Sequence, residues 1–238
     1  APRALPLQTP LDADPQHSSP RTRGAEAAGH ETHTMRSILA LATAVAASMQ
    51  GYQAPSQYAR QRVARSAAPL VTEKITYTTV GAYGAQVLQP QLLTLGCKSA
   101  PLIGAGQWWR LATPMLLHAS PAHLIVNMIS LRNVGRSLER AYGAKKTLVV
   151  YVASGIAGNL LSCAKGPVGS TSVGASGAIA GLIGALAVHL YRHQELYGTR
   201  GLDSIRDTVL LNALLGATAG NIDNMAHLGG LLGGAAVG

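Results

Sequence analysis

Long apolar stretches without a charged residue are the feature of this sequence that most limits its fold. Residues 147–164 and 166–191 contain no Asp, Glu, Lys or Arg, and charged residues make up only 12% of the chain. An ordinary soluble domain has about 25% charged residues, and a soluble fold cannot cover its surface with so little polarity. The sequence therefore predicts an all-α, polytopic membrane protein.

Small residues are abundant, and several recur four positions apart. The chain has 27 Gly and no Phe, and the spaced pairs are Ser154 with Gly158, Gly177 with Gly181, and Gly230 with Gly234. Such pairs let helix backbones approach closely in lipid, where the hydrophobic effect gives helices no reason to associate. We expect most of these glycines to serve helix packing.

The formal net charge of +9 does not indicate a nucleic-acid partner. The Lys and Arg residues lie in short segments between apolar runs, without a continuous basic face or stacking aromatics. We interpret them as topology signals that place the N-terminal side and the connections near residues 136–146 and 192–206 on the cytosolic, stromal or matrix face. Cys97 and Cys163 are too few for a disulfide framework and lack the spacing of metal ligands.

Residues 1–74 are typical of targeting or processing sequence, mostly disordered, and residues 75–238 are expected to form the membrane domain. No acid occurs from Met35 to Thr72, although Arg and Ser are present, as in organelle transit peptides. The apolar run 37–48 is too short to span a bilayer, which needs about 20 residues. A signal peptide followed by a transit segment is one interpretation, and a merely disordered tail is the other. The expected location is an organelle membrane, plastid or mitochondrial, or a secretory-pathway membrane.

Six helices are predicted in the membrane domain. Their expected ranges are 76–95, 121–141, 146–164, 176–193, 204–220 and 225 to the end. The first is interrupted by Gln and Pro residues. The last would reach only about 21 Å, short of a hydrocarbon core of about 30 Å, so we expect it to be truncated.

Polar residues stand at the starts of the second, fourth and sixth predicted helices, which all begin on the outer face. His123 and Asn127 share one face of the second helix because they are four residues apart. Ser176 opens the fourth helix and His227 the sixth. Strongly polar residues within a membrane are costly and indicate a functional site by default.

These residues have the chemistry of a serine nucleophile with its base. A serine hydroxyl needs an adjacent base, and His227 can accept the Ser176 proton and return it to the leaving amine. No acid is positioned to orient the histidine, so we expect a dyad. Asn127, His123 and the backbone N–H of Ser176 are candidate oxyanion donors, and Gly174 and Gly177 let substrate backbone come close. Separate explanations remain for each residue: Ser176 as a helix N-cap, His227 as a satisfied buried histidine, and Asn127 as a link between helices.

At these residues the sequence resembles the rhomboid family of intramembrane serine proteases, over about residues 75–238. The matching motifs occur in family order: Trp109-Arg110, His123 to Asn127, Glu139, Gly174-Ala-Ser176-Gly177, and Ala226-His227 followed by Gly230 and Gly234. Together with the leader, the pattern is most similar to plastid-type rhomboids.

The resemblance implies a six-transmembrane-helix bundle that cleaves the transmembrane segments of single-pass membrane proteins in the lipid bilayer, without metal or cofactor. It implies Ser176 as nucleophile, His227 as base, and His123 and Asn127 as oxyanion donors. Trp109, Arg110 and Glu139 match positions with structural roles. One departure is Ala180, where many family members have a Tyr that packs against the catalytic histidine.

Three alternatives were weighed. A soluble serine hydrolase is excluded because the motif is not G-x-S-x-G and no strand is expected before it. A metalloprotease would use His189 and His193, which are four residues apart but lack the Glu of H-E-x-x-H. A proteolytically inactive rhomboid-like protein that binds transmembrane clients would be expected to have lost Ser176 or His227.

Overall fold

The computed structural model describes residues 71–197, 199–218 and 222–238, which all fall in one compact unit. The expected leader, 1–74, lies almost entirely outside these residues. The longer helices are α3 (Val71–Leu88), α6 (Pro121–Tyr142), α7 (Ala144–Lys165), α8 (Ser176–Arg192), α10 (Arg200–Thr218) and α11 (Asn224–Val237). The short elements are α4 (Gln91–Gly96), β1 (Lys98–Ser99), α5 (Ala100–Gly104), η1 (Trp108–Leu111), η2 (Thr113–Leu116), β2 (Thr171–Ser172) and α9 (Gln194–Tyr197).

The predicted helix pattern is confirmed for five of the six helices, with boundaries that differ by a few residues. The prediction for the first helix was wrong at both ends. Helix α3 is already helical at Val71 and stops at Leu88, and a separate helix, α4, follows. The break occurs at Pro90, which has no N–H to continue the helical ladder.

A small antiparallel ladder joins two connecting segments that are distant in sequence. In it Lys98 pairs with Ser172, and Ser99 with Thr171. The expectation that no strand comes before Ser176 was therefore wrong for this two-residue ladder. Because β2 is so short and antiparallel, it is not the long parallel strand that leads into the serine of a soluble hydrolase.

Helix α11 packs against both α7 and α8, and small residues make this contact possible. A Cβ atom on Gly230 would overlap the carbonyl oxygen of Gly177, and one on Gly234 would overlap that of Gly181. On the opposite side, a Cβ on Gly158 would overlap the carbonyl oxygen of Ala226. The glycine pairs noted in the sequence therefore lie where the backbones of α7, α8 and α11 touch.

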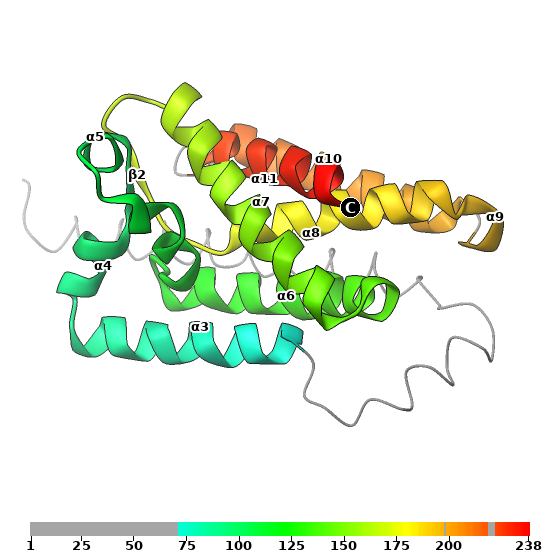
Figure 1. Ribbon diagram of the computed structural model, residues 1–238, viewed down its shortest axis with the longest axis horizontal. Helices are drawn as coiled ribbons and strands as arrows, with labels where there is room; N and C mark the ends of the chain where they lie inside the picture. The colour runs from blue at the N-terminus through cyan, green and yellow to red at the C-terminus, as the bar shows by residue number, and fades with distance from the viewer. Residues whose placement is uncertain (1–70, 198, 219–221) are drawn as a thin grey trace, which may run out of the picture. The chain divides into compact units, whose positions relative to one another are not determined.

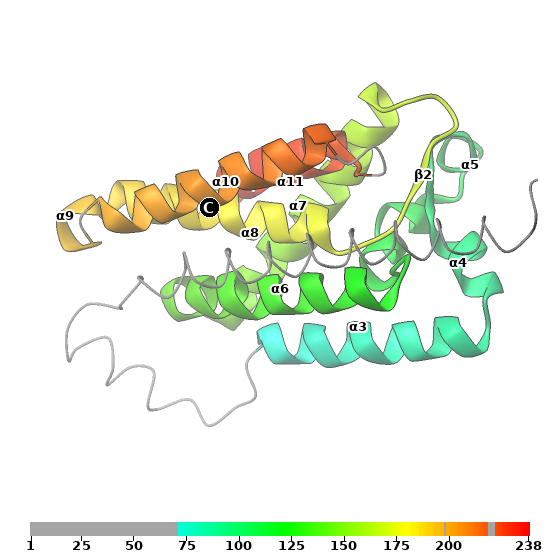
Figure 2. The same ribbon diagram turned by 180° about the vertical axis from the view of Figure 1, so that it is seen from behind.

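Helix α3 lies beside α6 in both views (Figures 1 and 2) and turns a polar face toward it. Its buried residues are Thr72, Thr76, Thr79 and Gln86. The carboxylate of Glu139 on α6 accepts hydrogen bonds from the backbone N–H groups of Val71 (2.7 Å) and Thr72 (3.1 Å) and from the Thr72 hydroxyl (2.7 Å). Arg136 and Glu73 add an ion pair between the same two helices. In lipid, such hydrogen bonds hold helices together where apolar contact alone would not.

Within the part of the chain that the structure describes, one helix, α7, is both long and apolar enough to cross a membrane. Helix α8 is apolar but has 17 residues, or about 26 Å against a hydrocarbon core of about 30 Å. Helix α6 is long enough but carries three Arg residues and Glu139. The six-transmembrane-helix bundle therefore stays a prediction.

Gln86 of α3 also holds the segment that leads into α6. Its amide donates to the backbone carbonyl of His118 (2.7 Å) and accepts from the backbone N–H of the same residue (3.1 Å). The ring of His118 is fully buried, and neither ring nitrogen has a hydrogen-bond partner among the described residues. Burial, together with the nearby charge of His123, lowers the pKa of His118 to about 4.

The glycine contacts predict a large difference between two Gly→Ala substitutions. Gly230→Ala should destabilise the protein by about 2 to 3 kcal/mol, because its Cβ has no room against α8. Gly84→Ala on α3 is the matched control, since a Cβ there meets nothing within 4 Å, and it should be neutral or stabilising by up to about 1 kcal/mol. Thermal unfolding in detergent measures both, and equal effects would contradict the packing described for α11.

The buried ring of His118 predicts a loss of stability in mild acid. Its pKa is lower in the folded state than its ordinary value of 6.5, so the unfolded chain gains the proton first as the pH falls. Stability should decrease as the pH falls from about 6.5 to about 4, by at most about 3 kcal/mol from this group. Unfolding measured across this range should show a smaller decrease for His118→Leu than for the parent chain. Parallel curves would show that His118 does not contribute.

Candidate active site

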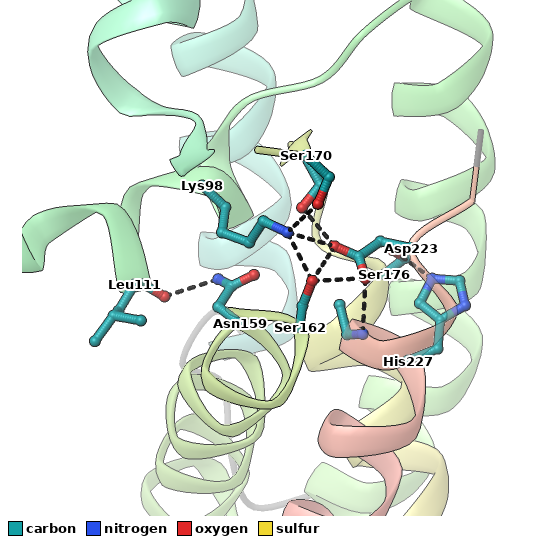
Figure 3. A network of polar contacts seen from close by, with 10 residues as sticks. Lys98, Leu111, Asn159, Ser162, Ser170, Ser176, Asp223 and His227 are labelled. Atoms are coloured by element: carbon teal, nitrogen blue, oxygen red, sulfur yellow. Dashed lines mark hydrogen bonds and ion pairs between the residues drawn. The ribbon is translucent and has the colours of Figure 1, made fainter. Parts of the chain in front are cut away.

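The N-terminal ends of α6, α8 and α11 lie on the same side of the bundle, the side where β2 lies (Figures 1 and 2). Two of these ends meet directly. The Oγ atom of Ser176, the first residue of α8, is 2.7 Å from Nε2 of His227 in the first turn of α11. Both side chains are half-buried, and Figure 3 shows them facing each other. A hydroxyl and an imidazole at this distance share a hydrogen bond along which a proton can pass.

Two glycines, one on each side of Ser176, shape the backbone there. Gly174 has a φ of +129°, a conformation that side-chain-bearing residues rarely adopt, and its N–H donates to the carbonyl of Pro114 (2.9 Å). The N-cap of α8 is Ala175, so Ser176 does not cap its helix. A Cβ on Gly177 would lie 3.2 Å from the carbonyl oxygen of Ala226. This close approach of α8 to the start of α11 brings the serine next to the histidine.

His123 lies against Gly174, close to the serine. A Cβ placed on Gly174 would lie 2.6 Å from Cε1 and 2.9 Å from Nε2 of the His123 ring, so only glycine leaves room for the imidazole there. His123 is held at the start of α6 by Ser120, whose hydroxyl accepts from the His123 backbone N–H (3.2 Å). This placement fits a donor beside a developing oxyanion.

The side-chain amide of Asn127, which we expected to donate to an oxyanion, already donates one hydrogen bond within its own helix. It is 4% exposed, and its amide nitrogen donates to the backbone carbonyl of His123, 2.9 Å away, on the same helix. A side-chain amide has two N–H donors, so one is already engaged. Because His123 and Asn127 both belong to α6, this hydrogen bond does not link separate helices.

An acidic residue that the sequence analysis did not select, Asp223, lies one turn before His227. Its carboxylate is the N-cap of α11 and accepts from the backbone N–H of Ala226 (3.0 Å). Further donors are the hydroxyls of Ser162 (2.6 Å) and Ser172 (2.7 Å) and the ammonium group of Lys98 (3.2 Å). Figure 3 shows Ser162 and Lys98 beside the carboxylate. Burial by itself would raise the pKa of the Asp223 carboxyl, but these donors together hold it below its usual value.

Among the described residues, no hydrogen bond joins the Asp223 carboxylate to the His227 ring. The acid therefore does not complete a Ser-His-Asp triad of the usual geometry. The sequence did contain a signal for Asp223, because an Asp directly before the first residue of a helix is a typical N-cap. Lys98 had no such signal, since its burial depends on the fold.

A small cavity of about 20 Å³ lies beside the serine. Ser176, Gly174 and Gly177 line it together with polar side chains from other elements, which are Asn159, Ser172 and Asp223. Asn159 is fixed by donating to the carbonyl of Leu111 (2.8 Å). A polar cavity of this size has room for a water molecule with several hydrogen-bond partners.

The remaining expected site residues lie away from the serine and histidine. Arg110 is buried, and its guanidinium donates to the carbonyls of Thr94 (2.9 Å) and Cys97 (2.8 Å). Trp109 is half exposed and donates to the carbonyl of Leu95 (3.2 Å). Both tie η1 to the segment around α4, while Glu139 joins α6 to α3, so these contacts are structural.

The histidine pair considered for a metal lies near the C-terminal end of α8. His189 and His193 have ring centroids 4.5 Å apart, and Nδ1 of His193 is 2.8 Å from the carbonyl oxygen of His189. The described residues contain no group of three or more His, Cys, Asp or Glu side chains that could hold a metal ion. A third protein ligand for this pair is therefore not seen.

The known proteins that this chain resembles carry rhomboid names. The rhomboid protease GluP of Bacillus subtilis strain 168 is 40% identical over 143 residues, which cover 60% of this chain and 28% of that protein. Rhomboid-like protease 1 of Toxoplasma gondii is 43% identical over 155 residues, covering 62% of this chain and 52% of the relative. RHOMBOID-like protein 5 of Arabidopsis thaliana is 38% identical over 148 residues, covering 61% and 48%.

This chain thus spans from about a quarter to about half of the length of these relatives. The family model described as the rhomboid domain matches residues 105–238. The matched range contains Ser176, His227 and the elements that surround them, and it covers more than half of the chain. The chain therefore belongs to the rhomboid family of membrane-embedded proteins.

Proposed function

We propose that this chain is an intramembrane serine endopeptidase in which Ser176 is the nucleophile and His227 is the base. The observation that carries the proposal is the 2.7 Å contact between Ser176 Oγ and His227 Nε2. Membership of the rhomboid family supports it, since members of that family are generally intramembrane serine proteases. Ser176 is half-buried at the start of a helix, so substrate can reach it and the helix dipole favours negative charge there.

In the first step, His227 Nε2 accepts the proton of Ser176 Oγ while the oxygen attacks the scissile carbonyl carbon. The tetrahedral oxyanion is stabilised by N–H donors near the start of α8. The ring of His123, beside Gly174, is one such donor, and the second N–H of Asn127 and the backbone N–H of Ser176 are others. The intermediate collapses when His227 returns the proton to the leaving amine, which leaves an acyl group on Ser176.

In the second step, water replaces the amine. The cavity beside Ser176 supports this step because polar atoms of Asn159, Ser172 and Asp223 line it. A water molecule held there is activated by His227, attacks the acyl carbon and releases the acid product, after which Ser176 regains its proton. No metal or cofactor takes part in the proposed reaction.

The proposed substrates are transmembrane segments of single-pass proteins, cut near the outer interface of the lipid bilayer. A peptide bond inside a helix is shielded by the helix's own hydrogen bonds, so the segment must unwind locally before Ser176 can reach a carbonyl. We further propose that the protein lies in an organelle membrane, and a plastid membrane is our first choice. The acid-free range 35–72, which is typical of organelle transit peptides, supports an organelle location.

The dyad predicts that two single substitutions abolish cleavage. Ser176→Ala and His227→Ala should each lower kcat for a model single-span substrate by at least about 1,000-fold, because they act on one chemical step. The matched controls are Thr171→Ala, an exposed hydroxyl in β2, and His193→Ala, an exposed imidazole at the end of α8. Both should retain activity. Purified chains in liposomes and an electrophoretic cleavage assay provide the measurement.

The same assay separates the alternatives. Activity that survives Ser176→Ala would refute the serine mechanism, and activity lost with EDTA and with His193→Ala would indicate a metalloprotease. A folded parent chain that binds the substrate without cutting it would identify an inactive rhomboid-like protein.

The need for unwinding predicts a preference among substrates. A transmembrane segment with Gly or Pro near its outer end should be cut at least about tenfold faster than a poly-Leu segment of the same length, since each such residue destabilises the helix by about 1 to 3 kcal/mol. Initial rates on the two segments, placed in the same carrier protein, measure this ratio. Equal rates would show that local unwinding does not limit cleavage.

A further inference from the structure

The Lys98 side chain is a buried cation in a chain with few charges. It is 0% exposed, and its ammonium nitrogen donates to Ser162 Oγ (2.7 Å) and Ser170 Oγ (3.3 Å) and pairs with Asp223 (3.2 Å). A buried charge is tolerated only when it is paired and hydrogen-bonded. Such pairs add little to stability compared with apolar residues of similar size, so stability alone does not account for this one.

The pair connects elements that are far apart in the sequence. Lys98 lies in β1, in the segment before α6, and Asp223 lies 125 residues later at the start of α11. Ser162, at the end of α7, and Ser172, in β2, donate to the same carboxylate. Figure 3 shows Lys98, Ser162 and Asp223 converging beside Ser176 and His227.

Asp223 also acts directly on the backbone that carries His227. Its carboxylate caps α11 through the N–H of Ala226 (3.0 Å), and its own carbonyl accepts from the N–H of His227 (3.1 Å). The first turn of α11 is therefore fixed to α7 and to both strands through one side chain. Because Ala180 provides no large ring to pack against the histidine, the position of His227 depends more on its backbone.

We propose that Asp223 is a positioning residue that keeps His227 within hydrogen-bonding distance of Ser176, and that Lys98, Ser162 and Ser172 hold it in place. This inference rests on the proposed protease function. In this role the carboxylate fixes the turn from which the imidazole extends. A displacement of that turn by 1 Å would lengthen the hydrogen bond of the dyad beyond its useful range.

The test compares two double variants that both remove the buried charges. In Lys98→Met with Asp223→Asn, the new amide oxygen can still cap Ala226 and the amide nitrogen can donate to the serine hydroxyls. In Lys98→Met with Asp223→Ala, those hydrogen bonds are lost while the charge balance is the same. Asp203→Asn is the control, because Asp203 forms an exposed ion pair with Arg206 on α10. For each, kcat and KM are measured on a single-span substrate, normalised to the folded fraction.

The Asn double variant is expected to keep kcat within about threefold of the parent chain, as is Asp203→Asn. The Ala double variant should lose at least tenfold in kcat with KM within about threefold, and its Ser176 should react at least tenfold more slowly with a fluorophosphonate probe. Equal kcat for the two double variants would overturn the proposal, as would a loss confined to KM. If the Ala variant does not fold, Ser172→Ala decides through the rate at which Ser176 reacts with the fluorophosphonate, a reaction that needs no water: slower labelling supports the proposal and an unchanged rate refutes it.

A Ser176→Ala chain measured in parallel separates this inference from the proposed function. If the parent chain cleaves and Ser176→Ala does not, the protease function stands whatever the double variants do. If Ser176→Ala still cleaves, the proposed function fails, and the positioning role fails with it.

Discussion

The close contact between the backbones of α8 and α11 is the constraint on which the rest of the structure depends. Gly177 and Gly181 of α8 face Gly230 and Gly234 of α11, where a Cβ on Gly230 or Gly234 would overlap the carbonyl oxygen of Gly177 or Gly181. Ser176 comes directly before the first of these glycines, and His227 lies three residues before Gly230. Because a larger residue at Gly230 or Gly234 would separate the helices, the same packing that stabilises the bundle sets the distance between hydroxyl and imidazole.

Several polar side chains in this protein act as clamps, by which we mean that each one hydrogen-bonds backbone groups of a different segment. Glu139 binds the first described turn of α3, Gln86 binds the backbone of His118, and Arg110 binds two carbonyls near α4. Each clamp satisfies backbone groups that lipid would leave unpaired. The Lys98 and Asp223 pair follows the same principle, but it lies beside the serine and histidine, where small displacements have chemical consequences.

Sequence patterns predicted the helices and the candidate residues more completely than they predicted how those residues are oriented. Ser120 and Pro121 mark the start of α6 and Gly143 its end, because caps and turns depend on local chemistry. Sequence patterns identified Ser176 and His227 because their motifs lie at the starts of helices that begin on the same side of the bundle. The same rules indicate that α3 ends before Pro90, and the prediction of a helix up to residue 95 was therefore wrong.

Other features depend on contacts between distant residues, which a pattern does not specify. The burial of Lys98 follows from the ladder with Ser172 and from the position of α11, so no local signal predicts it. The engagement of the Asn127 amide with the carbonyl of His123 is a choice between two hydrogen-bonding directions that the sequence leaves open. Such orientations decide which groups donate to a reaction intermediate.

The central claim is that the imidazole of His227 activates the hydroxyl of Ser176. The most direct measurement is the covalent labelling of Ser176 by a fluorophosphonate, mapped to the peptide by mass spectrometry, in the parent chain and in His227→Gln. The account predicts labelling at Ser176 that falls by at least about 100-fold in the variant. Labelling of Ser176 at an undiminished rate without the imidazole, or at another residue, would contradict it.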